Sequence, residues 1–164
     1  MNEAHIHLII NHLPIIFPIA GIIAIITGLI SKSESVKRTS FLIFILGALA
    51  TIAAMKSGEG AEDVVEKISG VSEVYIEKHE ELAERFAIFS YLLGGISLLG
   101  LWISFKKNAN SNIFNVVILS IALSTLFLAQ KTGTSGGEIR HTEIRNDSTV
   151  PPAENNSSGE DNDE

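Results

Sequence analysis

Four long stretches that carry almost no charge dominate the sequence, at about residues 8–30, 39–56, 86–105 and 113–130. Each has roughly the 17–25 residues that a helix needs to cross a hydrocarbon core about 30 Å thick. Only 19% of the 164 residues are charged, whereas soluble domains average about 25%. The sequence therefore predicts an all-α integral membrane protein, a four-helix bundle with four spans in contact with the lipid bilayer.

Composition excludes several classes of chemistry. The chain has no cysteine, which excludes disulfides, iron–sulfur clusters, covalently attached c-type haem and cysteine nucleophiles. A net charge of −7 argues against nucleic acid as a partner, because phosphate binding needs a basic surface. The sequence also lacks the zinc-protease, nucleophile-elbow and phosphate-loop motifs. We therefore assign no catalytic residue, and whether the chain is an enzyme stays open.

Charge is distributed unequally between the two predicted faces of the membrane. The connection at 31–40 and the residues directly after 105 are mainly basic, whereas 56–85 and the segment from 131 onward are mainly acidic. Basic connections remain on the cytoplasmic side of a membrane. This rule predicts that both termini face outward, into the periplasm if the cell has one.

One domain is expected, with four spans over 1–145, and a disordered acidic tail follows it over 146–164, whose Ser, Asn, Pro, Asp and Glu cannot form a core. The third span should begin well before the membrane, since Ser72 is a suitable helix cap and no breaker follows it. Gly136 and Gly137 predict a helix stop and turn after Gln130. No internal repeat is evident.

Small residues recur at helical spacing in three spans and predict faces of close helix contact. An alternative is a groove for a flat cofactor or a quinone. The three sets are Gly21, Ala24 and Gly28, then Gly47, Thr51 and Ala54, and finally Ser90, Gly94 and Ser97.

All five histidines lie at the predicted outer face. His12 lies inside the first apolar block, where an ionisable residue is a functional hypothesis by default. His79 lies on the apolar stripe of the third helix and not on the face of the glutamates around it. We therefore take His12 and His79 as the best candidates to bind a cofactor and His7 and His141 as the next, with His5 as a further candidate metal ligand.

Neutral imidazoles support either of two cofactors. A b-type haem needs two histidines from facing helices at similar depth, with small residues around the ring. A divalent metal needs three or four converging histidine or carboxylate groups. His7 matches His79 in height, whereas His12 can pair with His79 only if the first span begins near Leu13. The simpler alternative is that His12 is an interfacial residue and His79 a helix contact.

Four motifs, in this order, resemble those of a widespread bacterial family of small four-span membrane proteins of unknown function. The resemblance covers about residues 5–144. Two departures are Leu13, where the family often has phenylalanine, and the polar segment after the glycine pair. The motifs are His7-Leu-Ile-Ile-Asn-His12-Leu-Pro-Ile, Ser57-Gly-Glu-Gly-Ala-Glu, His79-Glu-Glu-Leu-Ala and Gly136-Gly-Glu-Ile.

Members of that family also occur fused to Rieske or c-type cytochrome domains, so the resemblance implies a role in membrane electron transfer. Our first hypothesis is a haem b or metal module that passes electrons to a periplasmic cytochrome or oxidase subunit. The second is a non-catalytic scaffold or assembly subunit of a respiratory or cytochrome complex, whose acidic surface suits a basic cytochrome. Sensing of pH or metal through the histidines is a third. Monomer and homo-oligomer both remain open.

Overall fold

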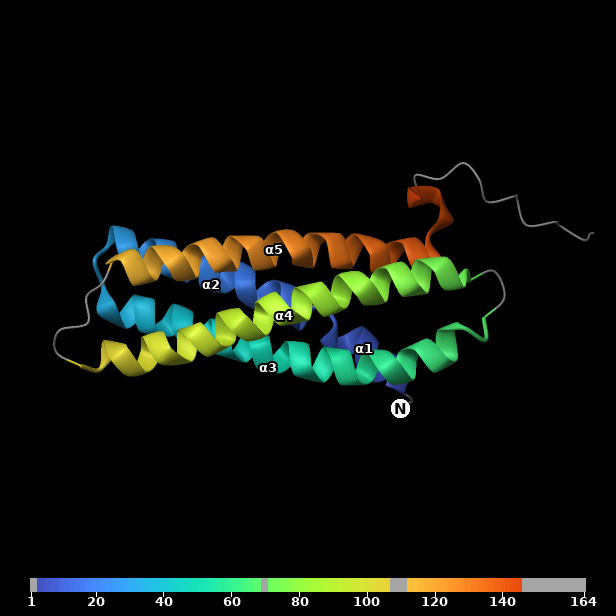
Figure 1. The fold of residues 1–164 in the computed structure, drawn as a ribbon, viewed down its shortest axis with the longest axis horizontal. Coiled ribbons are helices and arrows are strands. Elements are labelled where there is room, and N and C mark those ends of the chain that lie inside the picture. Colours follow the sequence, from blue (N-terminus) through green and yellow to red (C-terminus); the bar gives the residue numbers. More distant parts are fainter. Residues whose placement is uncertain (1–2, 69–70, 107–111, 146–164) are drawn as a thin grey trace, which may run out of the picture.

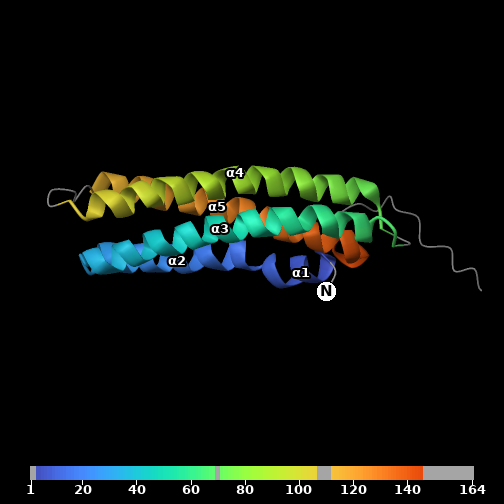
Figure 2. The ribbon, with the colours of Figure 1, turned by 90° about the horizontal axis from the view of Figure 1, so that it is seen from below.

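The computed structural model describes residues 3–68, 71–106 and 112–145, and these residues form helices without any strand. Figures 1 and 2 show a bundle of four long rods, the first of which is divided into α1 and α2. This confirms the all-α four-helix bundle. The segment 146–164 lies outside the described residues. The helices are α1 (Glu3–Ile10), α2 (Leu13–Ile30), α3 (Glu34–Val65), α4 (Glu73–Ser104), α5 (Asn112–Arg140) and the 3-10 helix η1 (Thr142–Ile144).

Each rod is long and apolar enough to cross a membrane, with α1 and α2 counted together. Large apolar side chains also cover the outside of the bundle, where Ile23, Leu98 and Phe127 are each more than half exposed. Water would penalise such a surface, whereas lipid does not. The protein is therefore a multi-pass membrane protein.

The helices pack in a square. α2 contacts α3, α3 contacts α4, α4 contacts α5, and α5 returns to α2, so α2 and α4 lie on diagonally opposite corners. The chain thus forms two antiparallel hairpins, α1–α3 and α4–α5. We call the end that carries His7 and His79 the histidine end, and the end with the connection at residues 31–33 the basic end (Figure 1).

Close contacts through glycine hold the rods together. The ring of Phe44 lies directly over Gly21, and a Cβ added at Gly94 would stand 2.5 Å from the Cβ of Ala48. Such small surfaces let helix backbones approach and gain dispersion contacts in lipid. The predicted small faces are confirmed as buried, with Ala24 half-buried: Gly21, Gly28, Gly47, Thr51, Ala54, Ser90, Gly94 and Ser97.

The first span differs from the expected continuous helix over 8–30, because it breaks at Asn11 and His12. Pro14 explains the break. It lacks the N–H that would bond the carbonyl of Ile10, and its ring clashes with that carbonyl, which favours a break at this point. The same residue is well placed in the first turn of a new helix, where that N–H is not needed, and α2 accordingly starts at Leu13.

The expected helix stop after Gln130 is wrong, since α5 continues through Gly136 and Gly137 to Arg140. Tertiary contacts outweigh the low helix propensity of glycine here. The Arg145 guanidinium donates to the carbonyls of Glu138 and Ile139, at 2.7 and 3.0 Å, and so satisfies groups that a helix end leaves unpaired.

The predicted early start of the third span's helix, well before residue 86, is confirmed, and the helix of the second span likewise continues past residue 56. α3 continues to Val65, and α4 begins at Glu73, directly after Ser72. Ser72 makes no side-chain capping bond, so only its position was predicted correctly. Lys78 in this extension forms an ion pair with the buried Glu138 of α5 at 2.6 Å and joins the two helices.

Side chains at the basic end are arranged to meet a membrane surface. Lys106 lies over the ring of Trp102 at 3.6 Å, and Arg38 lies over Phe105 at 4.5 Å. Arg38 also donates to the carbonyl of Ser104, which ties α3 to the end of α4. Aromatic and basic side chains of this kind anchor span ends at the lipid–water boundary.

Equivalent positions are buried in the two hairpins, although no local motif indicates this. The six buried residues of α2 each have a buried counterpart in α4, 72 positions later. Five buried residues of α3 have buried counterparts in α5, 78 positions later. The bundle is therefore an internal two-fold repeat of a helical hairpin. The α2 set is Pro14, Pro18, Gly21, Ile22, Ile25 and Gly28; the α3 set is Lys37, Ser40, Phe44, Gly47 and Thr51.

Adjacent glycines in α4 provide a matched test of this packing. We expect Gly94→Ala to lower the stability of the protein by about 1–3 kcal/mol, because its methyl group meets Ala48 and forces the helices apart. Gly95 is exposed, and a Cβ there meets nothing within 4 Å. Gly95→Ala should therefore be neutral or stabilising by up to about 1 kcal/mol. Thermal unfolding in one detergent measures both, and equal losses would contradict the packing.

Candidate functional site

His7 of α1 is fixed on α3 by its ring nitrogen Nδ1. This atom lies 3.1 Å from the carbonyl oxygen of Ala54 and 3.1 Å from the hydroxyl of Ser57. The Ser57 hydroxyl itself donates to the same Ala54 carbonyl. A carbonyl can only accept, so Nδ1 of His7 carries the proton and donates to both oxygens.

His79 of α4 repeats this arrangement on α5. Its Nδ1 lies 3.1 Å from the carbonyl oxygen of Thr132 and 3.0 Å from the hydroxyl of Ser135. The Ser135 hydroxyl donates back to the Thr132 carbonyl at 2.9 Å. Nδ1 of His79 is therefore a donor for the same reason.

A glycine follows the anchoring serine in both cases. A Cβ added at Gly58 would lie 3.5 Å from Cε1 of His7, and one added at Gly136 only 3.0 Å from Cε1 of His79. The absence of a side chain at Gly136 lets the His79 ring lie directly against the backbone of α5. Both imidazoles are thus fixed by one hydrogen-bonding pair and one glycine of the partner helix.

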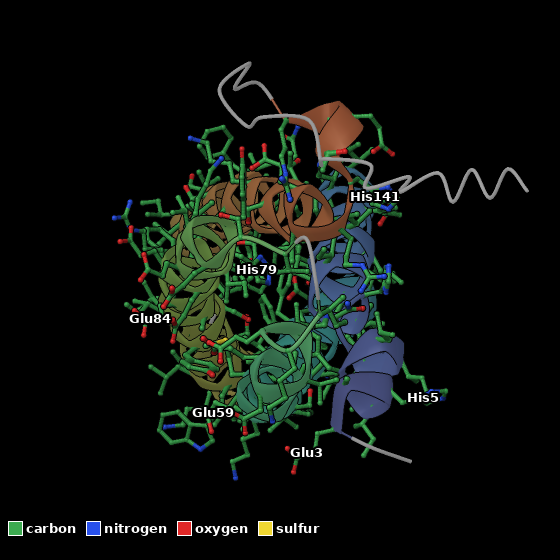
Figure 3. All side chains as sticks on the ribbon, turned by 90° about the vertical axis from the view of Figure 1, so that its right-hand side faces the viewer. Glu3, His5, Glu59, His79, Glu84 and His141 are labelled. Carbon is green, nitrogen blue, oxygen red and sulfur yellow. The ribbon has the colours of Figure 1, made fainter. Side chains whose placement is uncertain are left out.

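These two histidines are counterparts in the internal repeat. They are 72 positions apart, and their anchoring serines are 78 positions apart, the same offsets that relate the buried residues of the two hairpins. Their helices occupy opposite corners of the square at one end of the bundle, and the two rings are close enough to interact electrostatically. Figure 3 shows His79 between the helices when the bundle is viewed from this end.

The shared proton position leaves Nε2 as the reactive atom of each ring. A neutral imidazole that donates through Nδ1 has an unprotonated Nε2 with a free lone pair. Histidines that bind metals through one nitrogen almost always donate the other N–H to a carbonyl, carboxylate or water. The arrangement is therefore suited to ligation by two Nε2 atoms.

The other histidines lie elsewhere. His12 is exposed at the turn before α2, so the structure does not bring it into a buried site with His79. His5 points away from the bundle in Figure 3. His141 is exposed and pairs with Glu143 at 2.9 Å. A hydrogen bond from its own backbone N–H, and a second from His141, hold the pKa of Glu143 below its ordinary value.

Nothing in the described part of the chain groups three or more His, Asp or Glu side chains as a metal ion would require. Zinc and copper sites need three or four such ligands. Among the described residues, His7 and His79 are therefore not grouped with further His, Asp or Glu side chains into a set of three or more ligands.

Sequence reasoning missed Ser57 and Ser135 as partners of the histidines. One signal was present: Ser-Gly occurs at 57–58 and again at 135–136, with a histidine upstream in each case. The connections within the two hairpins differ in length. The repeat therefore has two different offsets, and a search for one fixed period does not find it.

The tautomers of His7 and His79 test this geometry directly. In cofactor-free protein labelled with ¹⁵N-histidine, we expect NMR to show Nδ1 protonated and Nε2 unprotonated in both rings. Ser57→Ala should alter the signals of His7, and Ser135→Ala those of His79, each without affecting the other. An Nε2–H tautomer in either ring would contradict the hydrogen bonding described.

The profiles of known protein families, the curated proteins and the solved structures contain no match to this chain. The family resemblance of its motifs therefore stays a prediction. The function has to be argued from the site alone.

Proposed function

We propose that the histidine end binds one b-type haem between Nε2 of His7 and Nε2 of His79, and that the protein is a module of membrane electron transfer. The observation that carries the proposal is the matched pair of Nδ1 anchors, on Ala54 and Ser57 and on Thr132 and Ser135. The two imidazoles, each with an unprotonated Nε2, would hold the haem iron.

The first rod packs less closely against the second hairpin at this end than further along the bundle. α1 packs against α3 and contributes little contact to α4 or α5, whereas α2 below it packs against α5. The two hairpins meet again where Ile15 lies against Gly133, whose added Cβ would stand 3.5 Å from Cδ1 of Ile15. The haem would lie on the membrane-distal side of this contact, beside small residues such as Gly58 and Gly136.

The chain's own residues would orient and tune the ligands. Each carbonyl–serine pair fixes the plane of its imidazole and, by accepting the Nδ1 proton, makes Nε2 a stronger donor. A bound haem supplies one-electron transfer, and the protein sets its potential through these ligands and their hydrogen bonds.

Charge around the site indicates the kind of electron-transfer partner. Exposed acidic side chains cluster on the extensions of α3 and α4. Such a surface attracts a basic soluble protein and speeds its association. With the basic end in the cytoplasm, as the positive-inside rule requires, this surface lies in the periplasm of a bacterial inner membrane. The partner would be a periplasmic cytochrome or an oxidase subunit. The exposed acidic residues are Glu59, Asp63, Glu66, Glu73, Glu77, Glu80, Glu81 and Glu84.

The absorption spectrum of the purified protein tests the proposal. We expect a Soret band, with sharp α and β bands after reduction by dithionite. His7→Ala and His79→Ala should each remove these bands, because one axial ligand is lost. The matched controls His12→Ala and His141→Ala should retain them, since both side chains are exposed.

A second, milder pair of variants distinguishes loss of haem binding from misfolding of the protein. Ser57→Ala and Ser135→Ala keep both histidines but each remove one hydrogen-bond partner of a histidine. Loss of a group that hydrogen-bonds a ligating histidine lowers the affinity for the bound metal group by roughly tenfold or more. Titration of the apoprotein with hemin measures that change. A colourless protein from haem-replete cells that also fails to bind hemin would overturn the proposal. The acidic surface would then favour the scaffold role in a respiratory complex.

A further inference from the structure

Two apolar grooves run side by side on the lipid-facing surface near the histidine end. One, of about 530 Å³, lies between α4 and α5 and is lined by Arg85, Phe89, Leu123, Ser124, Phe127 and Leu128. The other, of about 520 Å³, lies between α2 and α5 and is lined by Ile15, Ile19, Leu123, Leu126, Phe127 and Gln130. Both share Leu123 and Phe127, so the Phe127 side chain forms the ridge between them.

Two cations lie where this pair of grooves meets the membrane boundary. Lys131 Nζ is 4.8 Å from the centre of the Phe127 ring, over the ridge, and Arg85 lines one groove. The side chain of Arg85 is 66% exposed, and its ion pair with the equally exposed Glu81 is long, at 3.5 Å. Such an exposed pair contributes little and leaves the guanidinium available to another anion.

We propose that this surface binds a two-chain anionic phospholipid. The two grooves hold one acyl chain on each side of Phe127, and the headgroup phosphate lies between Arg85 and Lys131. Lipid phosphates at the membrane boundary attract Lys and Arg, whose aliphatic stems can lie along apolar surface. A quinone has one isoprenoid chain and no charge, so it matches neither the paired grooves nor the two cations.

Brominated lipids test the proposal, because bromine quenches tryptophan only at close range. The natural Trp102 at the basic end is first replaced (Trp102→Phe). Single reporters are then introduced as Phe89→Trp in the first groove and Ile19→Trp in the second. Both positions face lipid, so the larger ring should be tolerated. Each protein is reconstituted in vesicles containing brominated phosphatidylglycerol or brominated phosphatidylcholine.

We expect brominated phosphatidylglycerol to be preferred over phosphatidylcholine at both reporters, by roughly fivefold for each cation engaged. The double variant Arg85→Gln/Lys131→Gln should lose this preference. Lys56→Gln, which removes another exposed cation of the same end, should keep it.

Three results would overturn the proposal: equal quenching by both lipids, a preference at one reporter only, or a preference that survives in the double variant. Displacement of the brominated lipid by a neutral quinone, unaffected by the two glutamine substitutions, would assign the grooves to a quinone instead. All of these measurements use haem-free protein, because haem quenches tryptophan, so this site stands or falls separately from the histidine site.

Discussion

Lipid removes the usual hydrophobic force between helices, so this bundle depends on how closely its helices can approach. Gly21 beneath Phe44 and Gly94 against Ala48 make that approach possible in the membrane. The same constraint operates at the histidine end, where Gly136 lets the His79 ring lie on the backbone of α5. The hydrogen bonds that orient the two imidazoles therefore depend on the same close contact between helices.

Most of the fold could be predicted from the sequence, because spans, small faces and helix extensions are set by local composition. Three features of the structure were not predicted. α5 crosses Gly136 and Gly137 because the C-terminal segment caps its end through Arg145. His12, the favoured ligand, is exposed because Pro14 divides the first rod at that point. His7 is anchored by Ser57, 50 residues away, which no local pattern indicated.

The internal repeat gives the site its symmetry. Because the two hairpins are equivalent, each contributes one histidine, one serine and one glycine, and the two rings reach the same end from opposite corners. A cofactor between them would experience similar ligands on both faces. The acidic extensions, by contrast, do not follow the repeat. The positions of Glu80, Glu81 and Glu84 in α4 correspond to Leu8, Ile9 and His12 in the first rod. The site is therefore symmetric while the surface offered to a partner is not.

We propose that His7 and His79 share one cofactor, and the stoichiometry of haem to protein tests this sharing most directly. Pyridine haemochrome absorbance, divided by protein from quantitative amino-acid analysis, should approach one haem per chain at saturation. The electron paramagnetic resonance spectrum should then show a single low-spin species with two imidazole ligands. Two haems per chain, or a haem with only one histidine ligand, would contradict a site shared by the two hairpins.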